Sequence, residues 1–267
     1  MSDLMPRLSV HALRTWDTCP RQFALRYRLN RYWPAPEGHV QDAEGERRKR
    51  LGEAFHRLVE YQMRGLDLTR SLVAWLPELP ELEAMWRTFV ASPETRIPPG
   101  VSAWTEQALH ATIAGVPVMA RYDRIVRTGE RWQILDWKTG NLAHARLLDD
   151  WQTRLYPFLL VEAGEALGLG PIAPNQVEMV YVQVKGHDTW SLDHSTARHE
   201  ATRRELERRA TAAVAPFDPA LHDDPAFPRN PSACERCPYD TLCNARTVEP
   251  VPARPVVARF ALTEEEA

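Results

Sequence analysis

The N-terminal third of the chain places its apolar residues at helical spacing. Residues 7–29 show this spacing in two pieces, because Cys19-Pro20 interrupts the pattern, and Ser9 is suited to cap the first piece. The spacing returns over residues 44–65 and about 68–91. This part of the chain is therefore predicted to be helical and to end in the proline-rich segment that follows.

After residue 100 the pattern changes to an alternation of apolar and polar positions, which is typical of strands. Strands are predicted over residues 101–113, 116–127, 131–139, 175–185 and 188–193. Helices are predicted over residues 148–168, which contain Pro157, and over the arginine-rich residues 195–214. We expect one domain over residues 1–249, followed by a flexible tail at 250–267.

The second and third strands form a predicted hairpin that gathers unusual polar residues. Gly129 suits the first central position of a tight two-residue turn that needs a positive φ. A turn at this place makes Asp123 the direct partner of Asp136, with their side chains on one face. Lys138 follows two positions later and shares that face.

Two directly opposed carboxylates repel each other, so they need a compensating positive charge. One alternative is that the acids are exposed and bridged by arginines such as Arg121 or Arg124. The other is a bound divalent cation, for which oxygen ligands favour Mg²⁺ or Mn²⁺. A lysine beside such a metal can orient or activate a water, and this combination suits hydrolysis of a phosphodiester.

The amino-acid composition supports a specific role for Lys138. The chain has three lysines against thirty arginines, so Lys138 stands where arginine is the usual cation. The net charge of −3 gives no overall attraction to a polyanion, so binding of nucleic acid would need local basic surface or a metal. The sequence contains no apolar run long enough for a membrane span and no signal pattern at its start, so we expect a cytoplasmic protein without a membrane partner.

The cysteines also suggest a metal site. Cys234, Cys237 and Cys243 form a C-x₂-C-x₅-C motif, and Cys19 lies more than two hundred residues earlier. A structural disulfide is disfavoured in the expected compartment. Thiolates suit both zinc and iron–sulfur clusters, so both remain open from the spacing alone.

Asp123 and, thirteen residues later, the segment DWKTG resemble the core motif of the PD-(D/E)XK nucleases. More narrowly, the chain is similar to the branch that holds RecB-type nuclease domains and CRISPR-associated iron–sulfur exonucleases, and the similarity covers about residues 8–245. The opening segment LSVHALRTWDTCP matches that branch too. The resemblance implies an α/β, restriction-endonuclease-like fold with a central mixed sheet flanked by helices.

The resemblance also implies roles for individual residues. His56, in the segment LGEAFHRL, would bind the metal together with Asp123, Asp136 and a backbone carbonyl near Trp137. The resemblance further implies the substrate-positioning pair Gln152 and Tyr156 and the additional catalytic acid Glu106. Without the resemblance, His56 would pass as a surface or core histidine and Glu106 as an outward strand residue.

In the iron–sulfur members of the branch, one early and three late cysteines hold a 4Fe–4S cluster. The resemblance therefore assigns Cys19, Cys234, Cys237 and Cys243 to such a cluster, which joins the two ends of the domain, with Zn²⁺ as the alternative.

The function expected from the resemblance is metal-dependent cleavage of DNA, as an exonuclease on single strands. It would serve DNA repair, recombination or CRISPR-type DNA processing, with a helicase or CRISPR adaptation proteins as partners. Two alternatives stay open: a DNA-binding structural subunit of a helicase–nuclease complex, and a zinc-stabilised endonuclease acting on duplex DNA.

Overall fold

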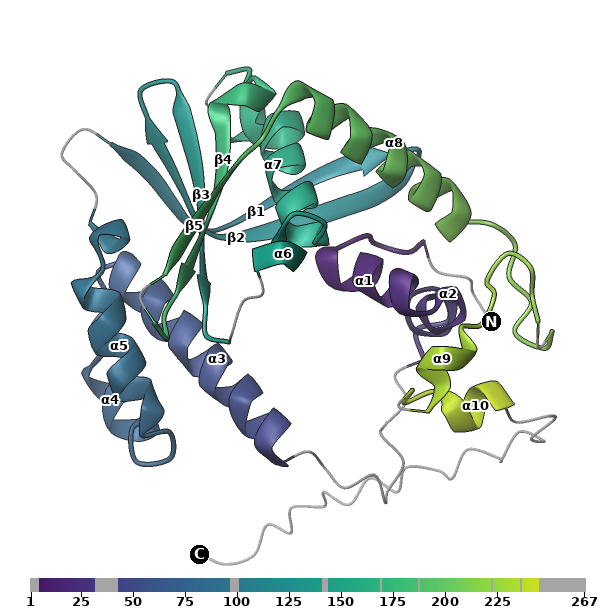
Figure 1. Cartoon of the computed structure of the whole chain (residues 1–267), viewed down its shortest axis with the longest axis horizontal. Coiled ribbons are helices and arrows are strands. Elements are labelled where there is room, and N and C mark those ends of the chain that lie inside the picture. Colours follow the sequence, from purple (N-terminus) through teal and green to yellow (C-terminus); the bar gives the residue numbers. More distant parts are fainter. Residues whose placement is uncertain are drawn as a thin grey trace, which may run out of the picture.

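A mixed five-stranded sheet forms the centre of the computed structural model (Figure 1). The structure describes residues 5–31, 43–96, 101–140, 144–168, 170–186, 188–221, 223–235 and 237–244. The strands follow one another across the sheet in chain order: β1 (Ser102–Ile113), β2 (Val116–Thr128), β3 (Arg131–Lys138), β4 (Val177–Gln183) and β5 (Thr189–Asp193). Neighbouring strands are antiparallel except β3 and β4, which are parallel.

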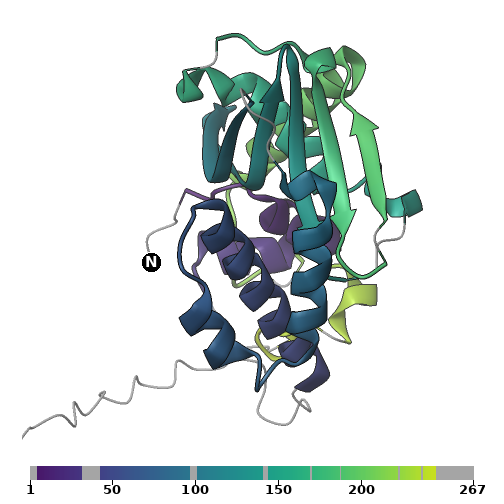
Figure 2. The same ribbon diagram turned by 90° about the vertical axis from the view of Figure 1, so that its left-hand side faces the viewer.

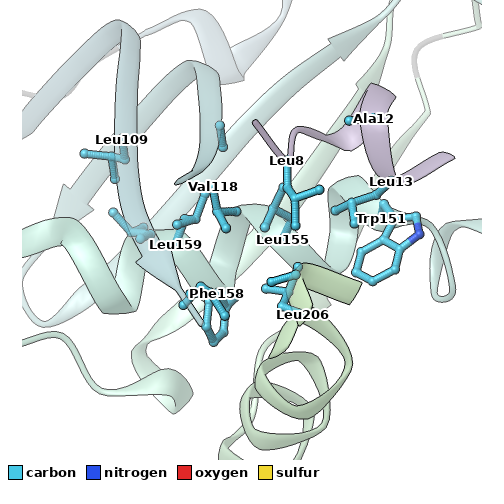
Figure 3. Packing of buried hydrophobic residues seen from close by; sticks show 14 of the residues in the cluster. Leu8, Ala12, Leu13, Leu109, Val118, Trp151, Leu155, Phe158, Leu159 and Leu206 are labelled. Atoms are coloured by element: carbon cyan, nitrogen blue, oxygen red, sulfur yellow. The ribbon is translucent and has the colours of Figure 1, made fainter. Parts of the chain in front are cut away.

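The parallel pair requires a crossover, which α6 (His144–Leu147) and α7 (Trp151–Ala163) provide. Helix α7 packs on the sheet together with α1 (Val10–Thr18) and α8 (Thr196–Ala213), as Figure 3 shows. Their apolar side chains meet those of the strands in one core, which includes Leu8, Leu13, Val118, Trp151, Leu155, Phe158 and Leu206. This core fixes α7 against β1, β2 and β4 of the sheet.

The helices of the N-terminal third cover the other face of the sheet. They are α3 (Ala43–Met63), α4 (Thr69–Trp75) and α5 (Glu81–Ala91), which lie together in Figure 2. Phe55, Leu58 and Phe89 from these helices pack with Trp137 and Val180 of the sheet in a second core. Trp137 is fully buried, and its ring meets that of Phe89 edge-on at 5.5 Å between centroids.

The two ends of the described chain lie side by side. After α1 come α2 (Pro20–Phe23) and the π-helical turn Ala24–Arg28, and near the C-terminal end come α9 (Pro231–Cys234) and α10 (Asp240–Asn244). Figure 1 places α9 and α10 next to α1 and α2. Asn230 Nδ2 donates to the carbonyl of Thr18 at 2.9 Å, and Tyr239 Oη donates to the carbonyl of Arg31 at 2.7 Å.

The predicted strands and most predicted helices are confirmed, with one correction. The helix expected over about 68–91 is two helices, α4 and α5. They are separated by a segment with prolines at positions 77 and 80, where the helix cannot continue undisturbed. The expected tail at 250–267 lies outside the described residues.

From the turn up to Arg124 and Leu135 the register of the hairpin is the predicted one, but the ladder does not include the predicted pair of Asp123 with Asp136. Arg124 pairs with Leu135, Ile125 with Ile134, and Thr128 with Arg131, which leaves residues 129–130 as the two-residue loop. The φ of Gly129 is +61°, as a turn of this class requires.

Near the centre of β1 and β2, the alternation of side chains between the two faces of the sheet shifts by one residue. Glu106 has a φ of +51° and, together with Asp123, is missing from the β1–β2 ladder, although the residues on both sides are paired. Tyr122 and Ile125 consequently both contribute to the core under α7, although their positions differ by an odd number. The irregularity lies where the predicted acidic residues are found.

Within the described residues, no helix combines the length and the apolar character that crossing a bilayer would demand.

Candidate active site

Four elements bring the polar residues of the hairpin together with their predicted partners. Asp123 lies on β2, and Asp136 and Lys138 lie near the end of β3. Helix α7 supplies Gln152 from its first turn, because the Asp150 side chain caps that turn by accepting from the Gln152 N–H at 2.8 Å. Helix α3 supplies His56.

Asp136 is the buried centre of this group, with only 4% of its surface exposed. Lys138 Nζ lies 2.6 Å from Asp136 Oδ2, and Gln152 Nε2 donates to Asp136 Oδ1 at 2.5 Å. Burial raises the pKa of Asp136, the Lys138 ammonium opposes that rise, and the nearby Asp123 charge adds to it, so that the net direction is upward.

Lys138 is held in place from two sides. Its Nζ donates to Gln152 Oε1 at 2.7 Å in addition to its contact with Asp136, and it lies 5.4 Å from the ring centroid of Tyr181. Lys138 and Asp136 therefore share one face of β3, as their spacing predicts. The single amide of Gln152 binds the carboxylate through its nitrogen and the ammonium through its oxygen, which fixes both groups.

Asp123 faces a different set of partners. Its Oδ2 accepts from the backbone N–H of Trp137 at 3.1 Å and lies 3.3 Å from His56 Nδ1. Burial alone would lower the pKa of His56, but the charge and hydrogen bond of Asp123 outweigh it, so that the pKa is raised. The imidazole and the two carboxylates thus act on one another electrostatically, with Trp137 placing Asp123.

Glu106 approaches the group from β1. Its carboxylate is paired with Arg121 Nε at 2.7 Å, and 12% of its side chain is exposed. Burial and the Asp123 charge raise the pKa of Glu106, while Arg121 opposes the rise. Glu106 is therefore electrostatically coupled to Asp123, and Arg121, one of the predicted bridging arginines, compensates it. The other, Arg124, is buried with its guanidinium near Met63 Sδ and the carbonyl of Thr95.

Tyr156 lies one helical turn after Gln152. Tyr122 Oη donates to the backbone carbonyl of Tyr156 at 2.9 Å, and the two rings lie 4.9 Å apart. Burial, followed by the charges of Asp136 and Asp123, raises the pKa of Tyr156, so its hydroxyl stays protonated at neutral pH. Gln152 and Tyr156 share one face of α7, as their spacing predicts, and this face is turned toward the carboxylates, as the family resemblance implies.

The donor set suits a hard divalent cation, because it combines carboxylate oxygens with an imidazole nitrogen. Asp136 Oδ2 is buried and, despite the nearby ammonium, accepts no well-oriented hydrogen bond from the described residues. Among those residues, however, no group of three or more His, Cys, Asp or Glu side chains is arranged to hold a metal ion. In the structure Asp123 instead faces His56, while Asp136 faces Lys138 and Gln152.

All four cysteines line one small cavity between the two ends of the domain. Burial raises the pKa of Cys237, and the neighbouring thiols Cys19, Cys234 and Cys243 raise it further. Four converging thiols are a soft donor set that suits zinc or an iron–sulfur cluster. Within the described part of the chain, these four cysteines are not arranged closely enough to count as a group that holds a metal ion.

The sequence did not point to the ion pair that anchors α7. Arg14 of α1 donates to both oxygens of Asp150, at 3.1 Å through Nε and 2.6 Å through Nη2. Asp150 thus caps α7 and ties it to α1, which positions Gln152. An aspartate two residues before the expected glutamine was the available signal for the cap, but nothing in the sequence identified its partner.

Comparisons with known proteins agree with this architecture. The family model described as PD-(D/E)XK nuclease superfamily matches residues 7–244. Among solved structures, the chain is similar to one from Eubacterium rectale described as a "Putative exonuclease", with 12% identity, a TM-score of 0.54, and coverage of 96% of this chain and 94% of that one. The crystal structure of SSO0001 shows 14% identity and a TM-score of 0.39, over 93% and 90% of the two chains. No curated protein matches the sequence significantly.

Proposed function

We propose, from the premise that this chain belongs to the PD-(D/E)XK nuclease superfamily, that it hydrolyses phosphodiester bonds of DNA with Mg²⁺ or Mn²⁺. The observation that carries the proposal is the convergence of Asp136 and Lys138 on Gln152, with Asp123 held beside them by the Trp137 N–H and His56. A buried carboxylate, a second carboxylate and an ammonium on rigid strands form the arrangement that metal-assisted hydrolysis needs.

Asp123, Asp136 and His56 would hold the cation, together with the backbone carbonyl of Trp137, and Glu106 would take part through a bound water. When bound, such an ion supplies Lewis-acid polarisation of the phosphate and lowers the pKa of a bound water. The raised pKa of Asp136 fits this role, since a nearby cation would favour its ionised form.

Lys138 would orient the attacking water or stabilise the charge that develops on the phosphate. The amide of Gln152 holds the ammonium beside Asp136, so the positive charge is in place before the substrate arrives. Tyr156, protonated and next to Gln152 on α7, would donate a hydrogen bond to the substrate. An arginine could not replace Lys138, because a guanidinium is larger and does not give up its proton.

We further propose that the four cysteines bind a 4Fe–4S cluster, with Zn²⁺ as the alternative. Their convergence on one cavity supports a shared ligand rather than four separate thiols. A ligand there would join α1 and α2 to α9 and α10 and would stabilise the folded state by its binding free energy.

An exonuclease acting on single strands is the form of the activity that we propose. The likeness to the Eubacterium rectale protein, described as a "Putative exonuclease", supports the exonuclease part of this proposal. Repair, recombination or CRISPR-type DNA processing in the cytoplasm would be the setting, with a helicase or CRISPR adaptation proteins as partners. The alternative is a DNA-binding structural subunit of a helicase–nuclease complex, against which the complete set of two acids and a lysine argues.

The test is the product pattern on end-labelled linear and circular single-stranded DNA with added Mn²⁺. We expect linear strands to be shortened progressively from an end, circles to persist, and EDTA to stop the reaction. Cutting of circles would show that the activity is that of an endonuclease and not of an exonuclease. Absence of cleavage of either form by the metal-loaded protein would favour the structural subunit.

A further inference from the structure

A groove leaves the proposed active site between α1 and β2. It has a volume of about 330 Å³, and its lining includes Tyr156 and Gln152, whose amide bonds Asp136. That volume lies at the lower end of the range found for ligand sites, so the groove suits one nucleotide and not a duplex. Because Gln152 lines the groove and contacts both Asp136 and Lys138, a strand whose scissile phosphate lies at these two residues would place its next nucleotide beside the groove.

The rim of the groove is basic. Arg14 and Arg121 line it, and their side chains remain 49% and 62% exposed although each is paired with an acid. Arg14 contacts Asp150 through Nε and Nη2, and no hydrogen bond of Nη1 to another described residue is seen, so Nη1 can contact a ligand. His11 of α1 lies on the same rim, and its pKa is lowered by partial burial and then by the charges of Arg26 and Arg14. The rim thus carries two exposed guanidiniums, although the whole chain carries a net negative charge.

The remaining walls of the groove are apolar and aromatic. Val10 and Met119 line it, and the ring of Tyr156 lies at the end next to Gln152. An aromatic ring and apolar side chains beside cations form the combination that binds the base and the backbone of a single strand without regard to sequence. A free anion such as phosphate would use the arginines but would leave the apolar wall unused.

We propose that this groove binds the nucleotide next to the scissile phosphate of a single strand, with Arg14 and Arg121 contacting its phosphates and Tyr156, Val10 and Met119 facing its base and sugar. The inference rests on the proposed nuclease function and adds to it the path of the substrate away from the metal site. It also explains why an acidic protein can bind a polyanion, since the positive charge is concentrated along one short path.

The test compares the variants Arg14→Gln and Arg121→Gln with the control Arg87→Gln. Arg87 is an exposed arginine on α5, paired with Glu83 as Arg121 is with Glu106. Binding of a fluorescent oligothymidine is measured by anisotropy without divalent ions, so that no strand is cut. We expect each groove variant to weaken binding about five- to tenfold and to lower the slope of log Kd against log salt concentration by roughly 0.7, the share of one phosphate contact. The control should match the wild type.

A second arm separates this inference from the nuclease proposal. Hydrolysis of bis(p-nitrophenyl) phosphate with Mn²⁺ needs the catalytic centre but no neighbouring nucleotide. The groove variants should lose cleavage of the oligonucleotide at low concentration by a larger factor than they lose hydrolysis of this ester. Met119→Glu, which adds a negative charge without breaking an ion pair, should weaken oligonucleotide binding in the same way and replaces any arginine variant that fails to fold.

Binding of the oligothymidine by the groove variants as tightly as by the Arg87→Gln control, with unchanged salt dependence, would overturn the groove assignment. Failure of the wild type to hydrolyse either substrate would count against the nuclease proposal instead, since the binding measurement does not depend on cleavage.

Discussion

Gln152 is the residue that couples the two functional groups of the site. Its amide donates to Asp136 and accepts from Lys138, and 7% of its surface is exposed. A hydrogen bond donated to a carboxylate stabilises the charged form and lowers its pKa. Gln152 therefore opposes the rise that burial causes in the pKa of Asp136. It positions Asp136 and Lys138 in addition to its proposed contact with substrate.

We expect Gln152→Ala to reduce DNA cleavage by about ten- to a hundredfold, since two hydrogen bonds to charged groups are lost. Loss of the amide donor should raise the pKa of Asp136 further, so the acid limb of the pH–rate profile should move to higher pH. The control is Gln133→Ala, which removes an amide on β3 that donates to Glu178 at 3.0 Å, away from the site. A purely structural role for Gln152 would lower the melting temperature but leave the pH profile in place.

Spacing predicted that Asp123, Asp136 and Lys138 lie together, and the family resemblance added their partners, but neither predicted how these side chains contact one another. The hairpin register places Asp123 opposite Asp136, and the structure keeps that register up to Arg124 and Leu135. Beyond that pair, Trp137 N–H bonds the Asp123 side chain, so the two acids have separate partners. A side chain that captures a backbone donor is a tertiary detail that a pairing rule does not contain.

Among the elements, the irregularity in β1 and β2 was the feature hardest to foresee. A strand pattern predicts strict alternation, and the positive φ of Glu106 has no sequence signal, because glutamate seldom adopts it. The break between α4 and α5 could have been predicted more easily, since the two prolines between the helices mark it. The strands themselves, with their alternation and their glycine turn, were predictable almost to the residue.

The contact between α7 and α8 contains a buried pair of histidines. His194 Nε2 lies 3.4 Å from His199 Nδ1, and His199 Nε2 lies 3.0 Å from Glu162 Oε1 of α7. Burial, the neighbouring His199 and Arg198 together lower the pKa of His194 to about 4. His194 is consequently neutral in the folded protein at a pH where it would be protonated in the unfolded chain.

Stability should therefore fall as the pH drops from about 6.5 to about 4, because only the unfolded chain takes up the proton in that window. The expected loss is about 2–3 kcal/mol in the free energy of unfolding, measured by urea titration at several pH values. His194→Gln should flatten this dependence, while His110→Gln, at an exposed position of β1, should not. An equal slope in the wild type and the His194 variant would refute the assignment.

For the whole molecule, the cysteine cavity joins the ends of the chain that lie more than two hundred residues apart in sequence. The clustering of three cysteines and the solitary fourth were enough to predict their meeting. The identity of the ligand does not follow from the same pattern, since thiolates bind zinc and iron–sulfur clusters alike.

Cys237→Ser should therefore remove bound metal and lower the melting temperature by several degrees or more, because a structural metal contributes its binding free energy to folding. Iron and zinc analysis of anaerobically purified protein, with its visible absorbance, decides between the two ligands. Ser232→Ala, a change of similar size in α9, is the control. Unchanged metal content and stability in the Cys237 variant would show that the cysteines hold no shared ligand.

The central claim is that Asp136 and its neighbours cut DNA with a bound divalent ion, and the deciding measurement is the Mn²⁺-dependent cleavage rate of Asp136→Asn on single-stranded DNA. The matched control is Asp193→Asn, at an exposed position of β5 with 77% of its side chain accessible. We predict that Asp136→Asn folds and binds DNA but cleaves it at least about a hundredfold more slowly, while the control cleaves normally. Wild-type cleavage by Asp136→Asn would contradict the account.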